Sequence, residues 1–176
     1  MNDIKVVVFD FDGTLVLSNQ LKYDTFSQLF PEDLSCQGII TQVLGEILEA
    51  SRFVIIEEIV GRIKSAGEIF ISQSVDCLAE KYNDIVLDGA KKCDERNGAM
   101  QALEVLHSSH SLYVSSNTPQ TPLKEIVEYR GWAGYFRGVF GYPKKKYQTL
   151  RDIMYLEQKK PGQVLVVGAG KSDRDS

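Results

Sequence analysis

Two acidic residues directly follow a short apolar run near the start of the chain. Asp10 and Asp12 come after Val6–Phe9, and Gly13 follows the second acid. Four consecutive apolar residues, three of them β-branched, predict a strand that is buried on both faces, as in a parallel sheet. Ligands of open α/β sheets bind beyond the carboxyl ends of the strands, so we expect Asp10 at the mouth of a crevice. Gly13 supplies the backbone freedom that a sharp exit from the strand requires.

The two carboxylates would repel each other, and their proximity is costly without a compensating cation. A hard, oxygen-preferring divalent ion such as Mg²⁺ is their natural partner. One carboxylate could then attack phosphorus while the other holds a proton, which is covalent catalysis with a positioned acid. The alternative interpretation is a simple turn after a strand. The buried strand before the acids, and Thr14 and Leu15 after them, favour the catalytic interpretation.

Composition bounds the class of protein. The chain has 176 residues, of which 43% are hydrophobic and 25% are charged, as is typical of a globular protein with a sizeable core. A net charge of −4 predicts no bulk attraction to nucleic acid or to a membrane surface. An anionic substrate would therefore need local positive groups.

The sequence contains no recognisable targeting or membrane signal. No apolar run has the length of a transmembrane helix, and residues 1–5 lack the form of a signal peptide. Cys36, Cys77 and Cys93 are odd in number and widely spaced, which predicts free thiols in a reducing compartment. We therefore expect a cytoplasmic protein.

The hydrophobic pattern divides the rest of the chain into two parts. Residues 17–92 follow helical spacing and predict several helices without strands. Beyond them, helical segments alternate with short apolar runs that predict strands at residues 112–116, 137–140 and 164–167. This alternation predicts a doubly wound, parallel, Rossmann-like α/β sheet with right-handed crossovers. The expected domains are an α/β core, residues 1–16 and 93–176, and a helical insertion after the first strand.

The segment from Asp10 to Leu15 resembles the first motif of the haloacid dehalogenase-like (HAD) hydrolases, with the chain as a whole resembling helical-cap phosphatases of the phosphoglycolate phosphatase type. The resemblance implies that Asp10 is the nucleophile that forms an aspartyl-phosphate, and that Asp12 is the general acid/base. It places Thr14 among the substrate-binding residues. It also implies that residues 17–92 form a lid that excludes water from the reacting centre. Dehalogenases of the family lack the second acid, which phosphatases and phosphomutases carry.

The segment Ser115-Ser116-Asn117-Thr118 ends the second predicted strand, where a hydroxyl and a backbone amide can bind a phosphoryl oxygen. The resemblance matches Ser116 to the family's second motif, with Ser115 as the alternate, and assigns Asn117 to substrate binding through its backbone. Such residues at a strand end are also ordinary turn chemistry.

Three consecutive lysines, Lys144, Lys145 and Lys146, follow the third predicted strand. One ammonium group near Asp10 would screen both the carboxylate and an incoming phosphate. The Gly-x-Pro-x-x-Lys spacing resembles the third motif of the family and favours Lys146 as the catalytic and substrate-binding lysine. The other two lysines are expected on a solvated face.

The fourth motif departs from the family pattern. The segment after the last predicted strand resembles the family's metal loop, but Ala169 occupies the position of its first acid. Asp173 is retained and could hold Mg²⁺ through water. The sequence ends at Ser176, within the first turn of the helix that would follow, which leads us to expect a truncated form of a longer protein with an apolar sheet edge.

The expected function is Mg²⁺-dependent hydrolysis of a small, soluble phosphorylated metabolite, with Mg²⁺ held by Asp10, Asp12 and Asp173. Ser116 and Lys146 would hold the phosphoryl oxygens. A sugar phosphomutase is one alternative, because it uses the same first motif. A catalytically silent binding or regulatory protein is another, because Ala169 replaces a metal ligand. The sequence carries no signal for the oligomeric state.

Overall fold

The computed structural model describes residues 3–47, 50–67, 71–168 and 170. The chain divides into two compact units. The first unit comprises Met1–Asn19 and Ala90–Ser176, and the second comprises Gln20–Gly89. We call the first the α/β unit and the second the helical unit.

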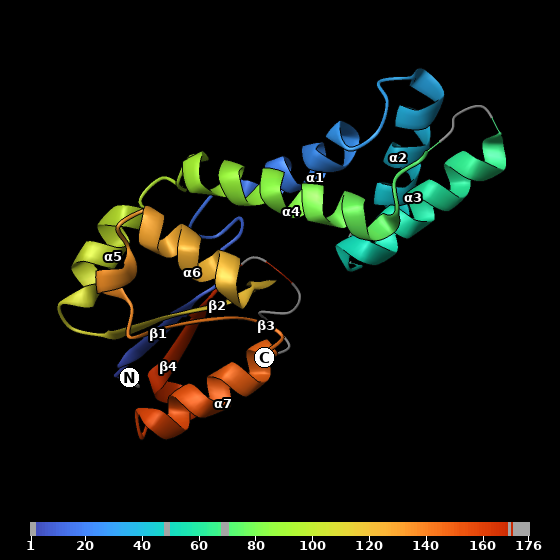
Figure 1. Ribbon diagram of the computed structural model, residues 1–176. Helices are drawn as coiled ribbons and strands as arrows, with labels where there is room; N and C mark the ends of the chain where they lie inside the picture. Colours follow the sequence, from blue (N-terminus) through green and yellow to red (C-terminus); the bar gives the residue numbers. More distant parts are fainter. Residues whose placement is uncertain (1–2, 48–49, 68–70, 169, 171–176) are drawn as a thin grey trace. The chain divides into compact units, whose positions relative to one another are not determined.

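A parallel sheet of four strands forms the centre of the α/β unit (Figure 1). The strands are β1 (Val6–Phe9), β2 (Ser111–Pro119), β3 (Gly138–Tyr142) and β4 (Val164–Val167), in the order β3-β2-β1-β4. Because the strand order reverses direction at β1, the carboxyl end of this strand lies at a topological switch point, where α/β sheets bind ligands. The doubly wound fold that the sequence predicts is confirmed.

Helices cover both faces of the sheet, as Figure 1 shows, with α7 on one face and α5 and α6 on the other. These helices are α5 (Ala99–His107), α6 (Gln120–Tyr129) and α7 (Lys146–Leu156). Two single-turn 3₁₀ helices, η1 (Ala133–Tyr135) and η2 (Pro161–Gln163), lie in the connections that precede β3 and β4. Buried side chains from two strands and α7 pack together on one face: Val6, Val8, Tyr113, Leu150 and Ile153. Alternate residues of β1 thus pack on opposite faces of the sheet, and both faces are covered, which is why the whole strand is apolar.

The last strand, β4, differs from the sequence-based expectation of a buried strand. Its residues are half-buried or exposed, and Leu165 is 45% exposed. The reason is its position: β4 pairs with β1 on one side, and none of the other strands described in the structure pairs with its opposite edge.

The helical unit has a core of its own, built from amphipathic helices. Its helices are α1 (Ser18–Gln28), α2 (Leu34–Ile47), α3 (Arg52–Ala66) and α4 (Val75–Lys92), of which α1 and α4 continue beyond the unit. The residues of α3 that face the core, Ile55, Ile56, Ile59 and Ile63, follow helical spacing and are almost fully buried. The helix begins where the Ser51 hydroxyl accepts from the Val54 amide, and it ends at Gly67 with φ of 75°.

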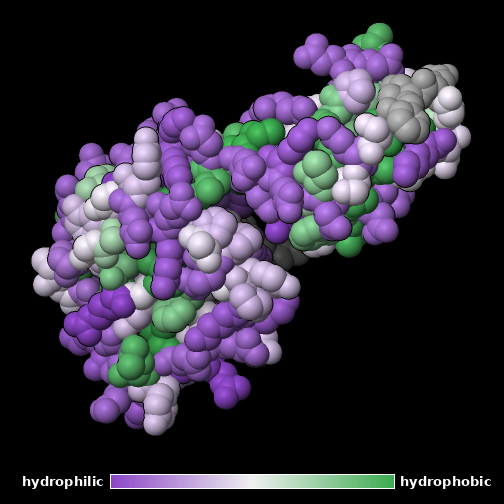
Figure 2. Space-filling view, viewed as in Figure 1, coloured by the Kyte–Doolittle hydropathy of each residue, from purple (hydrophilic) through white to green (hydrophobic). Residues whose placement is uncertain are grey.

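Polar residues cover most of the visible surface of each unit, with apolar residues in small patches (Figure 2). None of the helices that the structure describes combines the length and apolar character that a membrane crossing requires. Cys36, Cys77 and Cys93 are all free thiols, as the sequence predicts.

Candidate active site

The two acidic residues lie at the carboxyl end of β1, on a tightly hydrogen-bonded loop. The amide of Asp10 donates to the carbonyl oxygen of Val167 at 2.8 Å, which ties the end of β1 to β4. The Gly13 amide donates to the Val16 carbonyl oxygen at 2.7 Å, and Gly13 adopts φ of 73°, which favours glycine. Phe11 is fully buried between the two acids. These backbone hydrogen bonds therefore fix the positions of the Cα atoms from which both carboxylate side chains extend.

Lys146, the first residue of α7, pairs with Asp10. Its ammonium group lies 2.8 Å from Oδ1 of Asp10, and the exposed fractions of the two side chains are 8% and 10%. The other carboxylate oxygen of Asp10 accepts from the Thr14 hydroxyl at 3.3 Å. Two opposite charges buried this deeply stabilise each other, and removal of one member of a buried ion pair typically costs about 3–5 kcal/mol.

The neighbouring lysines make different contacts. Lys144 pairs with Asp152 at 2.5 Å, and the ammonium group of Lys145 lies 5.9 Å from the ring centre of Tyr142. Of the three consecutive lysines, Lys146 is thus the one that contacts Asp10.

The Asp12 carboxylate accepts hydrogen bonds from hydroxyl groups on both of its oxygens. Ser18, at the start of α1, donates to Oδ1 at 2.6 Å. Thr118, in β2, donates to Oδ2 at 2.6 Å, and Ser116 donates to the same oxygen at 3.3 Å. All three hydroxyl residues are buried. Among the contacts that the structure describes, an ammonium group lies beside Asp10 and three hydroxyl groups donate to Asp12.

The alternation of β2 explains which of its residues reach Asp12. Successive side chains of a strand point to opposite faces, so Ser116 and Thr118 share one face. Ser115 is buried without reaching Asp12 in the contacts that the structure shows, and Asn117 is exposed. The sequence analysis missed Thr118 and Ser18. For Thr118, the two-residue spacing from Ser116 would have been a signal only if the predicted strand had continued beyond residue 116.

A second segment of the chain braces the loop that carries Asp12. The guanidinium group of Arg96 donates to the carbonyl oxygen of Gly13 from Nε at 2.9 Å and also from Nη2. The amide of Arg96 donates to the carbonyl oxygen of Leu15 at 3.0 Å. The amide of Leu17 donates to the carbonyl oxygen of Asp94 at 2.8 Å. The loop is therefore held from outside by residues 94–96 as well as by its own turn.

The donor set suits a hard cation. Asp10 offers a carboxylate oxygen and Asp12 a backbone carbonyl oxygen at the end of β1, and Mg²⁺ is commonly bound by one or two carboxylates, other oxygen ligands, substrate phosphate and water. Within the described ranges, no group of three or more His, Cys, Asp or Glu residues is arranged to hold a metal ion by itself. Asp173, a predicted ligand, and Ala169 lie outside the described residues.

A sequence model of the haloacid dehalogenase-like hydrolases matches residues 4–175. The chain belongs to this hydrolase family. The HAD resemblance that the sequence analysis found is thus confirmed, and so is the expectation of an enzyme. The HAD chain is 27% identical, over 192 aligned residues, to the phosphoglycolate phosphatase of Vibrio parahaemolyticus, an alignment that covers 97% of this chain and 78% of that relative.

Solved structures of the family share the fold. A predicted phosphoglycolate phosphatase from Haemophilus somnus aligns with a TM-score of 0.72 at 20% identity, over 97% of this chain and 79% of that one. The HAD hydrolase YfnB of Bacillus subtilis, solved with bound magnesium, aligns with a TM-score of 0.68 at 14% identity, over 98% of this chain and 85% of that one.

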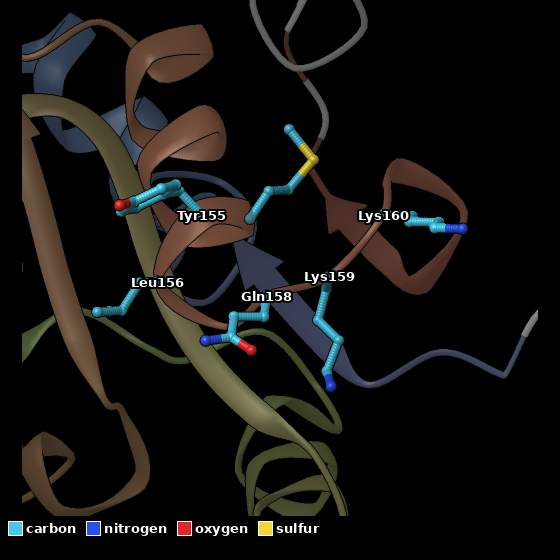
Figure 3. Close-up of a pocket in the computed structure, with 6 residues that line it drawn as sticks. Tyr155, Leu156, Gln158, Lys159 and Lys160 are labelled. Carbon is cyan, nitrogen blue, oxygen red and sulfur yellow. The ribbon is translucent and has the colours of Figure 1, made fainter.

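A pocket of about 540 Å³ lies at the other end of α7 and is separate from the candidate site. Figure 3 shows the side chains around it, which come from the end of α7 and the segment that follows: Met154, Tyr155, Leu156, Gln158, Lys159 and Lys160. A helix rises about 1.5 Å per residue, so the length of α7 places this pocket roughly 15 Å from Lys146. It contains no carboxylate among its lining residues.

Proposed function

We propose that the chain is a Mg²⁺-dependent phosphomonoester hydrolase that acts on a small phosphorylated metabolite through an aspartyl-phosphate at Asp10. The observation that carries the proposal is the buried contact of 2.8 Å between Asp10 and Lys146, beside an Asp12 carboxylate that hydroxyl groups hold. A nucleophile and a separate acid/base in different environments are what two-step phosphoryl transfer requires. The phosphatase among its relatives supports the same reaction.

In the first half of the reaction, a carboxylate oxygen of Asp10 attacks the phosphorus atom. The bond between phosphorus and the leaving oxygen breaks, and protonated Asp12 gives its proton to that oxygen, which leaves as an alcohol. Lys146 and the Ser116 hydroxyl bind the non-bridging phosphoryl oxygens, and Thr14 and the Asn117 backbone complete the substrate contacts.

In the second half, the Asp12 carboxylate takes a proton from a water molecule, whose oxygen attacks the phosphorus atom of the aspartyl-phosphate. The bond between phosphorus and Asp10 breaks, which releases inorganic phosphate and restores both side chains. The net reaction converts a phosphomonoester and water into an alcohol and phosphate.

The metal ligands proposed are the Asp10 carboxylate, the Asp12 backbone carbonyl and, through water, Asp173. Bound Mg²⁺ offsets the negative charge of the phosphoryl group. Because Asp10 and Lys146 already form a charge pair, the ion and the lysine would share the task of screening substrate charge.

We assign the helical unit to a cap that governs substrate choice, and the α/β unit to catalysis. The support for this assignment is the separate core of each unit. The three free thiols agree with a reducing compartment, and we propose the cytoplasm.

The test is a turnover screen over phosphorylated metabolites that includes 2-phosphoglycolate, with Mg²⁺ and with a chelator. We expect release of inorganic phosphate and the matching alcohol with Mg²⁺ only, and none from the Asp10→Asn variant. An isomeric sugar phosphate formed without free phosphate would indicate a phosphomutase instead. Ligand binding without turnover across the screen would overturn the proposed hydrolysis.

A further inference from the structure

We infer that Thr118 is a positioning residue that fixes the direction of the Asp12 carboxylate. Its hydroxyl group lies 2.6 Å from Oδ2 of Asp12, across 106 residues of sequence. The inference rests on the proposed function in one respect, namely the acid/base role of Asp12. The positioning itself is a geometric claim about two side chains.

The backbone determines where the Thr118 hydroxyl points. Thr118 lies in β2, is 8% exposed, and its amide donates to the Ser116 hydroxyl oxygen at 3.1 Å. Threonine is β-branched, so its χ1 angle is restricted in a strand. The donor that reaches Asp12 is therefore rigid rather than a mobile surface hydroxyl.

Two donors on different elements hold the two oxygens of the same carboxylate. Ser18 contacts Oδ1 of Asp12 and Thr118 contacts Oδ2, each at 2.6 Å. One hydrogen bond would leave the carboxylate able to rotate about that contact. Because the second donor lies on the opposite oxygen, the plane of the carboxylate is fixed as well as its position.

Thr118 also separates two tasks that would otherwise fall on Ser116. Ser116 is 3.3 Å from Oδ2 of Asp12, a longer contact than that of Thr118. In the proposed reaction Ser116 must turn to a phosphoryl oxygen, and Thr118 then keeps Oδ2 of Asp12 engaged. A hydroxyl can donate to a carboxylate and accept from a carboxylic acid, so the contact suits both halves of the reaction.

The effect of Thr118 should appear in the step that uses Asp12 as an acid. The parameter kcat/KM reports all steps up to release of the leaving group, and only poor leaving groups need a proton there. We therefore expect Thr118→Val to lower kcat/KM for an alkyl phosphate by about 10–100-fold, a part of the 10²–10⁴ that general acid catalysis supplies. With p-nitrophenyl phosphate, an activated substrate, the loss should stay within about threefold, because little protonation is required.

Three further variants separate positioning from a merely structural effect. Thr118→Ser keeps the hydroxyl and should restore alkyl phosphate turnover to within a few-fold of the parent, and Asp12→Asn sets the maximal loss. Thr25→Val is the matched control, because the hydroxyl of Thr25 is also buried but donates to the Leu21 carbonyl oxygen of its own helix at 2.7 Å. Equal losses with alkyl and aryl phosphates in Thr118→Val would overturn the inference.

Crystal structures of Thr118→Val and Thr118→Ser provide a readout that needs no turnover. We expect the Asp12 carboxylate to rotate away from its position in the valine variant and to keep it in the serine variant. An unmoved carboxylate in the valine variant would overturn the inference even if every kinetic prediction held. If the parent protein hydrolyses no phosphomonoester, the proposed function fails, and the crystal structures still decide the positioning claim.

Discussion

At the scale of single residues, Asp10 and Asp12 are chemically identical side chains with different partners. Asp10 contacts the Lys146 ammonium group and the Thr14 hydroxyl, and the contacts shown for Asp12 come from hydroxyl groups. A cation beside one carboxylate favours its charged form, as a nucleophile requires. A hydroxyl group can donate to a carboxylate and accept from a carboxylic acid, which suits the acid/base role that we propose for Asp12. The contacts described for each acid support the division of roles that we propose.

The lysine assignment is testable by comparison of neighbours. We expect Lys146→Gln to lower kcat by about 10²–10³-fold, the usual cost of one lost electrostatic contact to the transition state. Lys144→Gln is the matched control, because Lys144 pairs with Asp152 and should change kcat by less than about threefold. Steady-state kinetics, with circular dichroism to verify folding, measure both. Similar losses in the two variants would show that Lys146 has no special role.

Sequence patterns predicted some of these residues better than others. Asp10 and Asp12 lie two positions apart, directly after a strand with a clear apolar pattern, so their motif is local. Ser18 and Thr118 were missed because a serine before a helix and a threonine at a strand end are ordinary cap and turn residues. Only the folded chain brings Thr118 to Asp12.

At the scale of secondary-structure elements, the carboxyl ends of β1 and β2 and the start of α7 build the site. Apolar runs predicted each strand, yet β2 extends to Pro119, three residues beyond the predicted end at 116. The added residues, Asn117, Thr118 and Pro119, form no apolar run, and their strand geometry depends on pairing, since Pro119 lies opposite Tyr142 after a register shift. Tertiary pairing of this kind has no local sequence signal.

Close packing between β3 and the start of α6 supports this part of the site. A Cβ atom at Gly141 would lie 2.5 Å from the Thr118 carbonyl oxygen and 2.8 Å from Cα of Gln120. We expect Gly141→Ala to lower the free energy of unfolding by about 1–3 kcal/mol, because backbone must move. Gly134→Ala is the control, since nothing lies within 4 Å of its Cβ position. Urea denaturation of both variants measures this loss of stability. Equal unfolding midpoints in the two variants would contradict the prediction.

The half-buried carboxylate of Glu157 joins the end of α7 to the sheet and should make stability depend on pH. Burial raises the pKa of Glu157, but hydrogen bonds from Tyr113 at 2.5 Å and Ser111 at 3.0 Å, with the charge of Arg137, outweigh it and lower the pKa below 4.5. A folded-state pKa below the unfolded one stabilises the protein above about pH 4.5, and this stability is lost as the pH falls further.

The prediction is that Glu157→Gln weakens the dependence of unfolding free energy on pH below 4.5. It should also lower stability at pH 7 by about 1–3 kcal/mol, because donors to the carboxylate lose a charged acceptor. Urea denaturation from pH 3 to pH 7 measures both effects. A parent and a variant with parallel pH curves would show that the interactions of Glu157 do not hold its pKa down.

At the scale of the whole molecule, the spacing of apolar residues changes along the sequence. Helical spacing predicted the helical segment, and its alternation with short apolar runs predicted the α/β segment. Each has its own buried cluster in the structure. The fold class could therefore be predicted well, because it depends on patterns that extend over many residues. Substrate choice could not, since apolar stripes in the helical unit pack into its own core and carry no chemical signature.

In the metal site that we propose, affinity depends on the complete ligand set, to which a carboxylate at position 169 would contribute. Hard-cation affinity rises with the number of charged ligands, so we expect Ala169→Asp to bind Mg²⁺ more tightly and to raise kcat at low Mg²⁺. Isothermal titration with MgCl₂ measures the affinity, and Ala169→Asn is the uncharged control. Identical affinities in all three proteins would mean that position 169 does not contact the ion.

The central claim is that Asp10 carries the phosphoryl group, and chemical trapping tests it most directly. Protein mixed with substrate and Mg²⁺ is quenched within a turnover and treated with borohydride, which reduces an acyl phosphate to the alcohol. Peptide mass spectrometry then locates the product. We predict homoserine at position 10 and none in the Asp10→Asn variant. A reduced residue at any other acid, or full turnover by Asp10→Asn, would contradict the account.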